Sequence, residues 1–250
     1  MRIDVLSLFP EACEPFFAAS ILGRAQSAGL VTIGCRNIRD YSDDPHRKVD
    51  DRPFGGGPGM VLMCQPVFGA VEAVVGEDDA TLVLLTPQGE RFDQHIAKEF
   101  AATERLVLIA GHYEGFDERV RAGLSPREIS IGDYILSGGE AAAMVLVDAV
   151  VRLVPGVLGH DGSVTEESFS LGGAAADNGV PGLTGLLEYP QYTRPRVFRD
   201  MEVPPVLVSG NHEEVRRWRA AEALRRTEGR RPDLLAARKT EDDSETRRNG

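Results

Sequence analysis

The sequence contains little lysine, little tryptophan and no long apolar run. Three of its 28 basic residues are lysines (Lys48, Lys98 and Lys239), and the others are arginines. Arginine binds phosphate with two parallel hydrogen bonds, although a GC-rich genome produces the same bias. The net charge of −11 argues against a protein held to nucleic acid by a uniformly positive surface, while leaving room for a local basic groove.

Cysteine is also scarce. Cys13, Cys35 and Cys64 are odd in number and widely spaced, which argues against a disulfide framework or a zinc site and fits a reduced cytosol. The longest apolar run, Ala141–Val147, is too short to span a bilayer. Asp4 interrupts the start before a signal peptide could form. We therefore expect a soluble, cytoplasmic protein that does not enter a membrane.

Several catalytic and binding motifs are missing. There is no Gly-Lys dipeptide and hence no P-loop, no GxGxxG, no GxSxG and no HExxH. The five histidines are scattered without metal-ligand spacing. A Rossmann dehydrogenase, a serine hydrolase and a tightly bound structural metal are therefore disfavoured. The polar candidates that remain are isolated carboxylates and arginines: Asp50, Glu114, Asp117, Asp133, Glu140, Arg152, Glu166 and Glu167.

The most informative stretch is residues 106–140. Leu106–Ala110 and Glu128–Ile131 are apolar runs typical of buried strands, and each continues into a glycine-containing loop, GHYEG and IGDYILSGGE. Without Cβ atoms, such loops allow a ligand to approach the main chain. They indicate one pocket built mainly from backbone; the alternative is a pair of tight strand-to-helix turns.

The pattern along the chain predicts an α/β fold. Strands expected over 3–9, 31–35, 81–85, 106–110 and 128–131 alternate with helices over 10–28, 65–75, 92–102 and 139–153, which is typical of a largely parallel sheet. We expect this domain over residues 1–160, a flexible linker over 161–184 and a helical domain with a frayed tail over 185–250.

Two segments have the composition of binding surfaces. Asn37–Met60 is polar and glycine-rich, which favours a binding loop over a flexible hairpin. The predicted helix Asn211–Arg226, with Asn211 as N-cap, belongs to a span with seven arginines against four glutamates. The ordinary interpretation is a solvated helix face. The more specific interpretation is a surface that contacts the RNA backbone.

Taken together, these segments resemble one family, the bacterial tRNA (guanine-N1)-methyltransferases that modify guanosine 37 (the TrmD family, of the SPOUT class). The resemblance runs in order from residue 1 to about residue 235. The segments that carry it are LSLFPE (6–11), HRKVDDRPFGGGPGM (46–60), LTPQG (85–89), GHYEGFDERV (111–120), EISIGDYILSGGE (128–140), VPGVLGH (154–160), YTRP (192–195) and MEVPPVLVSGNHEEVRRWR (201–219).

The resemblance implies a mostly parallel sheet whose loops form a deep trefoil knot, followed by a small helical C-terminal domain. Pattern reasoning alone would not find a knot, because threaded chains are rare. The knot loops of the family bind S-adenosyl-L-methionine. The matching positions are Leu84, Leu85, Pro87, Gly111, Tyr113, Glu114, Ser130, Ile131, Gly132, Asp133, Tyr134, Ile135, Leu136, Gly138 and Gly139.

The resemblance also implies the catalytic groups. A carboxylate takes the N1 proton of guanine, and an arginine stabilises the charge that moves onto O6. Arg152 matches the arginine. Glu167 stands where the family has aspartate, and Glu166 or Asp177 would be the alternative base. Glu140–Ala143 and the long linker depart from the family pattern too, and we expect no functional loss from either.

The remaining implications concern partners. The family is a homodimer with an intersubunit active site, and its substrate is tRNA with guanosine at positions 36 and 37. A magnesium requirement is allowed, with Asp50, Glu114 and Glu167 as possible ligands. The alternative function is a knotted RNA-binding protein that binds the cofactor but has lost turnover. Residues that match tRNA-contacting regions are His46, Arg47, Asp50, Gly57, Arg216 and Arg217.

Overall fold

The structure is a computed structural model that describes residues 1–158, 167–170 and 185–236. The chain divides into two compact units, Met1–Gly159 and His160–Gly250, and each is described by itself. Apart from residues 167–170, the predicted linker lies outside the described residues, as do the alternative bases Glu166 and Asp177 and the predicted frayed tail beyond residue 236.

The first unit is built on a five-stranded sheet in the order β2-β1-β6-β5-β7, and every neighbouring pair is parallel. The sequence prediction of an α/β fold with a mostly parallel sheet is therefore confirmed. The strands and helices of this unit are β1 (Arg2–Ser7), α1 (Pro10–Phe17), α2 (Ser20–Ser27), β2 (Thr32–Asn37), the 3-10 helix η1 (Ile38–Tyr41), β3 (Asp50–Asp51), β4 (Val61–Leu62), α3 (Cys64–Val75), β5 (Thr81–Arg91), α4 (Gln94–Ala101), β6 (Arg105–Ala110), α5 (Glu118–Leu124), β7 (Arg127–Ser130) and α6 (Glu140–Val151).

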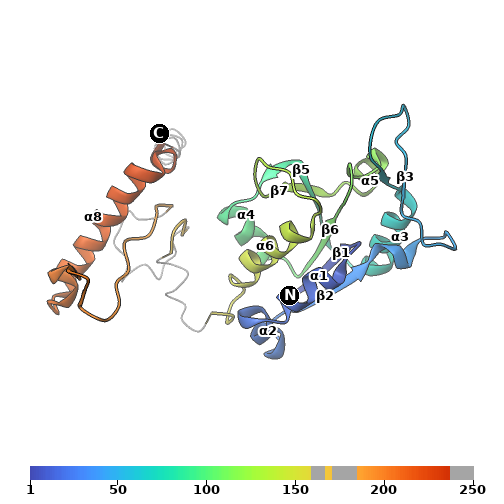
Figure 1. The fold of residues 1–250 in the computed structure, drawn as a ribbon. Coiled ribbons are helices and arrows are strands. Elements are labelled where there is room, and N and C mark those ends of the chain that lie inside the picture. The colour runs from blue at the N-terminus through green and yellow to red at the C-terminus, as the bar shows by residue number, and fades with distance from the viewer. Residues whose placement is uncertain (159–166, 171–184, 237–250) are drawn as a thin grey trace, which may run out of the picture. The chain divides into compact units, whose positions relative to one another are not determined.

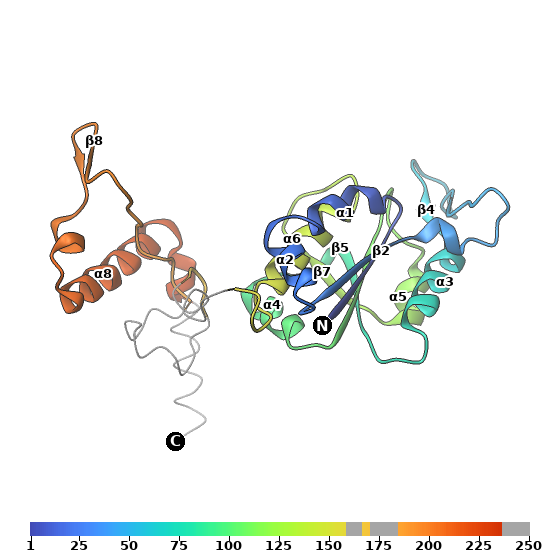
Figure 2. The ribbon, with the colours of Figure 1, turned by 90° about the horizontal axis from the view of Figure 1, so that it is seen from below.

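Helices cover both faces of the sheet (Figures 1 and 2). The apolar side chains of α1, α2, α4 and α6 form one buried cluster, and those of η1, α3 and α5 form another. The strands alternate between the two clusters: Val83 and Leu85 belong to the first, and Leu84 to the second. This alternation follows from the two-residue period of a strand, and it determines which side chains face each helical layer.

One helix prediction was wrong. The stretch 10–28 forms two helices, because the chain breaks at Ala18 and Ala19 and Ser20 takes a positive φ of 49°. A Cβ on Gly23 would lie 2.2 Å from the Ala18 carbonyl oxygen, so only glycine allows this close approach. Apolar periodicity continues across the break, and for this reason the pattern indicated a single helix.

Strand β5 is longer than the predicted Thr81–Leu85. It pairs with β7 through Leu85, leaves the ladder over the next four residues, and pairs again with β7 from Glu90. Both Leu85 and Glu90 oppose Ile129, so residues 86–89 protrude from the sheet edge as a loop. At Gly89 the backbones of strands β5 and β7 lie very close together, since a Cβ on Gly89 would be 2.4 Å from the Ile129 nitrogen.

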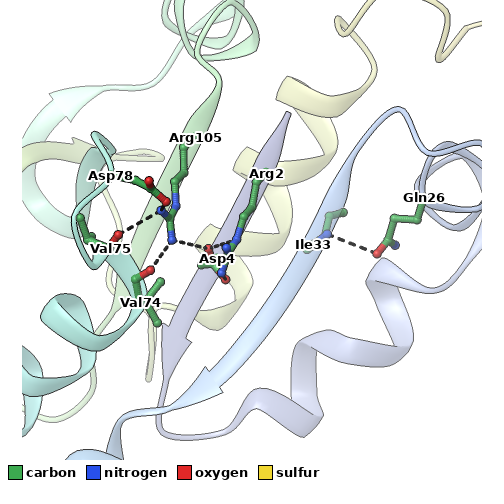
Figure 3. Close-up of polar contacts among 8 residues, drawn as sticks. All are labelled: Arg2, Asp4, Gln26, Ile33, Val74, Val75, Asp78 and Arg105. Atoms are coloured by element: carbon green, nitrogen blue, oxygen red, sulfur yellow. Dashed lines mark hydrogen bonds and ion pairs between the residues drawn. The ribbon is translucent and has the colours of Figure 1, made fainter.

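A buried polar network closes the amino-terminal end of the sheet (Figure 3). The Arg105 guanidinium is 9% exposed and binds Asp78 at 2.7 Å, the Val75 carbonyl at 3.1 Å and the Val74 carbonyl. It also lies 3.9 Å from Asp4, which pairs with Arg2 at 2.8 Å. A buried charge requires such partners, because desolvation without them is costly.

The second unit contains the hairpin β8 (Val197–Phe198) and β9 (Met201–Glu202), the 3-10 helix η3 (Pro205–Val208) and helix α8 (His212–Arg230). Asn211 caps α8, as predicted, by accepting hydrogen bonds from the Glu213 and Glu214 nitrogens. The helix continues four residues beyond the predicted end at Arg226. The buried Thr227 hydroxyl accepts a 3.0 Å hydrogen bond from the Leu187 nitrogen, which attaches the segment after residue 185 to α8.

Candidate functional site

A cavity of about 250 Å³ opens at the carboxyl ends of β5, β6 and β7. Three loops line it: residues 85–88 after the first part of β5, 111–116 after β6, and 129–139 from the end of β7. Ligands of parallel α/β sheets bind at this edge, where the chain leaves the strands. The prediction of one pocket shared by the glycine-containing loops is therefore confirmed for the geometry of the loops.

Two of these loops pass each other at very short distance. The Gly139 nitrogen donates a 2.8 Å hydrogen bond to the Gly111 oxygen, and His112 forms an antiparallel bridge with Gly138. A Cβ on Gly139 would lie 2.8 Å from the Ala110 Cα, and one on Gly111 would lie 2.4 Å from the Phe116 ring. Gly139 is required because main chain meets main chain there, and Gly111 because the Phe116 ring packs against it.

The GHYEG loop (residues 111–115) is also hydrogen-bonded to residues 60–62, in and just before strand β4. The Glu114 nitrogen donates to the Met60 oxygen at 3.0 Å, and the Leu62 nitrogen donates to the Gly115 oxygen at 2.9 Å. Tyr113 takes a positive φ of 61°, an unusual conformation for a bulky residue. Strain of this kind is held in place by surrounding contacts and concentrates at functional sites.

An ion pair fixes the exit of the same loop. Asp117 caps α5 and accepts two hydrogen bonds from the Arg119 guanidinium, at 2.8 and 2.7 Å, in addition to that residue's backbone N–H at 2.9 Å. These contacts hold the pKa of the Asp117 carboxyl well below its ordinary value. The carboxylate therefore remains charged and the turn into α5 stays fixed at neutral pH.

The residues predicted to bind cofactor converge on the cavity, with two exceptions. Leu84 is fully buried in the cluster on the opposite face of the sheet, and Asp133 is not part of the cavity wall. Their roles remain predictions. The predicted residues that line the cavity are Leu85, Pro87, Gly111, Tyr113, Glu114, Ser130, Ile131, Gly132, Tyr134, Ile135, Leu136, Gly138 and Gly139.

Other lining residues were not predicted, and Arg121 and His112 are the charged or titratable ones among them. The largely buried Arg121 guanidinium pairs with Glu128 at 2.9 Å and Glu118 at 3.0 Å. The His112 imidazole lies 2.7 Å from the Glu140 carboxylate. Arg121 could have been found from the sequence, because it lies four residues after Asp117, on the helix that follows the GHYEG loop. His112 stood inside the GHYEG segment itself.

The predicted tRNA-binding loop forms a hairpin whose short strands β3 and β4 pair antiparallel. Asp50 lies in β3, while the Gly57 region forms the tip, where the neighbouring Phe54 is fully exposed. Arg47 adopts a positive φ of 56° and pairs with Asp40. The loop is connected to the cavity wall through β4, and its contact with RNA remains a prediction.

The two α8 arginines predicted to contact tRNA are engaged in surface ion pairs. Arg216 and Arg217 both pair with Glu213, at 2.6 and 3.0 Å. Exposed pairs of this type contribute little stability, so a phosphate group could replace the carboxylate at small cost. Their predicted contact with tRNA is compatible with this surface.

The two predicted catalytic residues lie in different units. Arg152 caps the carboxyl end of α6 and is partly exposed. Glu167 belongs to a turn in the second unit, where its carbonyl accepts a 3.1 Å hydrogen bond from the Ser170 nitrogen. The Phe169 nitrogen donates to the Leu186 oxygen at 2.9 Å, which holds the turn against the segment after residue 185. Their roles remain predictions.

Within residues 1–158, 167–170 and 185–236, no three histidine, cysteine, aspartate or glutamate side chains gather in a way that could hold a metal ion. In the same part of the chain, no helix combines the length and the apolar character needed to cross a membrane.

The fold and the cavity define an α/β protein with a cavity, lined by three loops, at the carboxyl edge of a parallel sheet. Comparison with known sequences narrows this class. A family model described as tRNA (Guanine-1)-methyltransferase TrmD matches residues 1–237. The chain therefore belongs to the tRNA (guanine-1)-methyltransferase TrmD family.

Individual relatives agree with this assignment, and each is named tRNA (guanine-N(1)-)-methyltransferase. The chain is 54% identical to the protein of Moorella thermoacetica over 239 residues, which cover 94% of this chain and 90% of the relative. It is 54% identical to the Geobacillus kaustophilus protein over 236 residues (94% and 91%). It is 55% identical to the Pelotomaculum thermopropionicum protein over 238 residues (94% and 90%).

Proposed function

We propose that this chain transfers the methyl group of S-adenosyl-L-methionine to N1 of guanosine 37 in tRNA, forming 1-methylguanosine beside the anticodon. The observation that carries the proposal is the 54–55% identity, over 94% of the chain, to proteins named for guanine-N1 methylation of tRNA. The similarity therefore extends over residues of both units and is not confined to isolated motifs.

The cavity supports S-adenosyl-L-methionine as the methyl donor. Its volume of about 250 Å³ lies slightly below the range of about 300–1,000 Å³ for small-molecule sites. Gly111, Gly138 and Gly139 allow the loops around it to pack closely, because a Cβ at each would clash with neighbouring protein atoms. The same loops offer amide and carbonyl groups to a polar nucleoside. Glu114 at the cavity wall supplies negative charge toward a sulfonium cation. The residues present therefore fit this cofactor.

The bound cofactor would supply an electrophilic methyl group, and the protein residues would prepare guanine to accept it. The Glu167 carboxylate takes the N1 proton, which leaves a lone pair on N1 and negative charge on O6. The Arg152 guanidinium stabilises that charge. A correctly placed base typically contributes about 10²–10⁴-fold to the rate. When bound, the cofactor would supply the methyl group that N1 accepts, and its sulfur would retain the electron pair of the broken bond.

The length of α6 supports an active site shared between two subunits. The helix begins at the cavity, next to Gly139, and Arg152 caps its other end. At 1.5 Å per residue, the two residues are separated by about 20 Å of helix, which exceeds the reach of one arginine side chain. Arg152 would therefore serve the cavity of a partner subunit.

The surface of the first unit supports the homodimer. Phe16 on α1 and Val145 on α6 are exposed by 42% and 49%, and these two helices pack against each other. Phe9, just before α1, is 41% exposed. A partner subunit that covers this face would remove apolar area from water. In the same proposal, the crossing of residues 137–139 over 110–112 is part of a trefoil knot, and the second unit is the tRNA-binding domain.

The test uses purified protein, S-adenosyl-L-methionine labelled on its methyl group, and two tRNA transcripts that differ only in guanosine or adenosine at position 37, both with guanosine 36. Label should enter only the guanosine 37 transcript and should be recovered as 1-methylguanosine. Parallel reactions with EDTA test the magnesium requirement. Cofactor binding without any turnover would favour an impaired RNA-binding protein, and transfer to both transcripts would reject position 37 as the target.

A further inference from the structure

A buried carboxylate lies directly behind the wall of the cavity. Glu140, the first residue of α6, is only 7% exposed. One carboxylate oxygen accepts a hydrogen bond from the Ser7 hydroxyl at the end of β1, and the other lies 2.7 Å from His112 Nε2 in the loop after β6.

This network sits where the two cavity loops cross. A Cβ on Gly138 would lie 2.2 Å from His112 Nε2 and 2.5 Å from Glu140 Oε2, so nothing fits between the loops and the network. His112 and Gly138 are also joined by a backbone bridge, and both line the cavity. A change in the position of His112 must therefore move the wall of the cavity.

The neighbours of the network hold it in one arrangement. The Phe9 ring meets the His112 imidazole edge-on at 4.9 Å, and the Phe9 nitrogen donates a 2.8 Å hydrogen bond to the Ser7 oxygen. The Cys13 thiol lies 3.9 Å from the Glu140 carbonyl. The imidazole is followed in sequence by the strained Tyr113. Without the Glu140 contact, the loop would lack the side-chain hydrogen bond that fixes His112.

We propose that Glu140 is a positioning residue for the cofactor: by binding Ser7 and His112 together, it holds the crossing of residues 111–115 and 137–139 in the geometry that receives the cofactor. The inference rests on the proposed function, because it takes S-adenosyl-L-methionine as the ligand. Glu140 itself does not touch the reacting atoms and acts only through His112 and the two loops.

The experiment is calorimetric titration of the full-length protein with S-adenosylhomocysteine, the demethylated cofactor. We expect Glu140→Ala and His112→Ala each to weaken binding by about 10–100-fold, because the loss of one partner of a buried hydrogen bond carries a penalty of that order. Glu140→Gln keeps the shape and an accepting oxygen, so it should restore affinity to within about threefold of wild type. The double variant should bind no more weakly than either single variant, since both act through one contact.

Asp4→Asn is the matched control. Asp4 is an equally buried carboxylate on β1, but it faces the other side of the sheet and belongs to the Arg105 network. The Asp4→Asn substitution should lower the melting temperature of the protein without changing its affinity for S-adenosylhomocysteine. The inference is overturned if Glu140→Ala binds within twofold of wild type, if Glu140→Gln fails as badly as Glu140→Ala, or if Asp4→Asn weakens binding equally. Failure of the wild type to bind S-adenosylhomocysteine would instead overturn the proposed function, and the inference with it.

Discussion

If Arg152 acts at the cavity of a partner subunit, mixing two inactive variants should restore methyltransferase activity. The first variant is Arg152→Ala, which retains its cavity. The second is Gly139→Val, which retains Arg152 but places side-chain atoms where even a Cβ would be 2.8 Å from the Ala110 Cα. Overpacking of this kind typically costs about 1–3 kcal/mol and displaces the chain, so this cavity should not accept the cofactor.

The expected magnitude follows from symmetry. In a two-fold dimer, random mixing of equal amounts gives about half heterodimers, and each heterodimer has one intact site out of two, so activity should reach about a quarter of the wild-type value. The 20 Å of helix estimated between Gly139 and Arg152 is the reason to expect no contribution from Arg152 to the cavity of its own chain.

The assay is methyl transfer to the guanosine 37 transcript after the two variants are unfolded together, refolded and compared with each variant treated alone. Circular dichroism melting of both homodimers establishes that they are folded. If the mixture has no more activity than the sum of the two homodimers, Arg152 acts on the cavity of its own chain or not at all, and the reasoning from the length of α6 is refuted.

The other predictions concern the base, stability and the pH response. Glu167→Gln should lower kcat by about 10²–10⁴-fold, while Glu167→Asp should stay active. Near-normal turnover of the glutamine variant would indicate that Glu166 or Asp177 is the base instead. Arg105→Met breaks the buried network of Figure 3 and should cost about 3 kcal/mol, seen as a melting temperature lower by roughly 6–12 °C; an unchanged melting temperature would contradict this. Because the folded-state pKa of Asp117 is depressed, its stabilising contribution is full above about pH 5 and is lost progressively as the pH falls below that value. Asp117→Asn should therefore flatten the decline of the unfolding free energy between about pH 5 and pH 3, and parallel curves would exclude that role.

The strands and most helices could be predicted because the sequence encodes them locally. Short β-branched runs such as Leu106–Ala110 became strands, and Asn211 caps α8 through the hydrogen bonds that its residue type predicts. The break near Ala18 could not be predicted, since it depends on how closely Gly23 approaches a carbonyl in the folded chain. The return of β5 to the ladder at Glu90 likewise depends on the edge strand β7.

The site was predictable where glycines mark it and unpredictable where distant residues meet. Leu85 and Gly111 line the cavity, whereas Leu84 faces the opposite helical layer, as strand alternation alone could have indicated. The link between Ser7 and Glu140 joins residues 133 positions apart in the sequence. No local pattern encodes such a contact, so it needed the three-dimensional structure.

The most direct measurement for the whole account is the binding of S-adenosylhomocysteine to the wild-type protein and to Gly139→Val, by calorimetry under the same conditions. The cavity formed by three backbone-lined loops predicts saturable binding to the wild type and a loss of at least about 10²-fold in the variant. Absence of binding to the wild type, or equal binding to a folded variant, would contradict the claim that these loops hold the methyl donor.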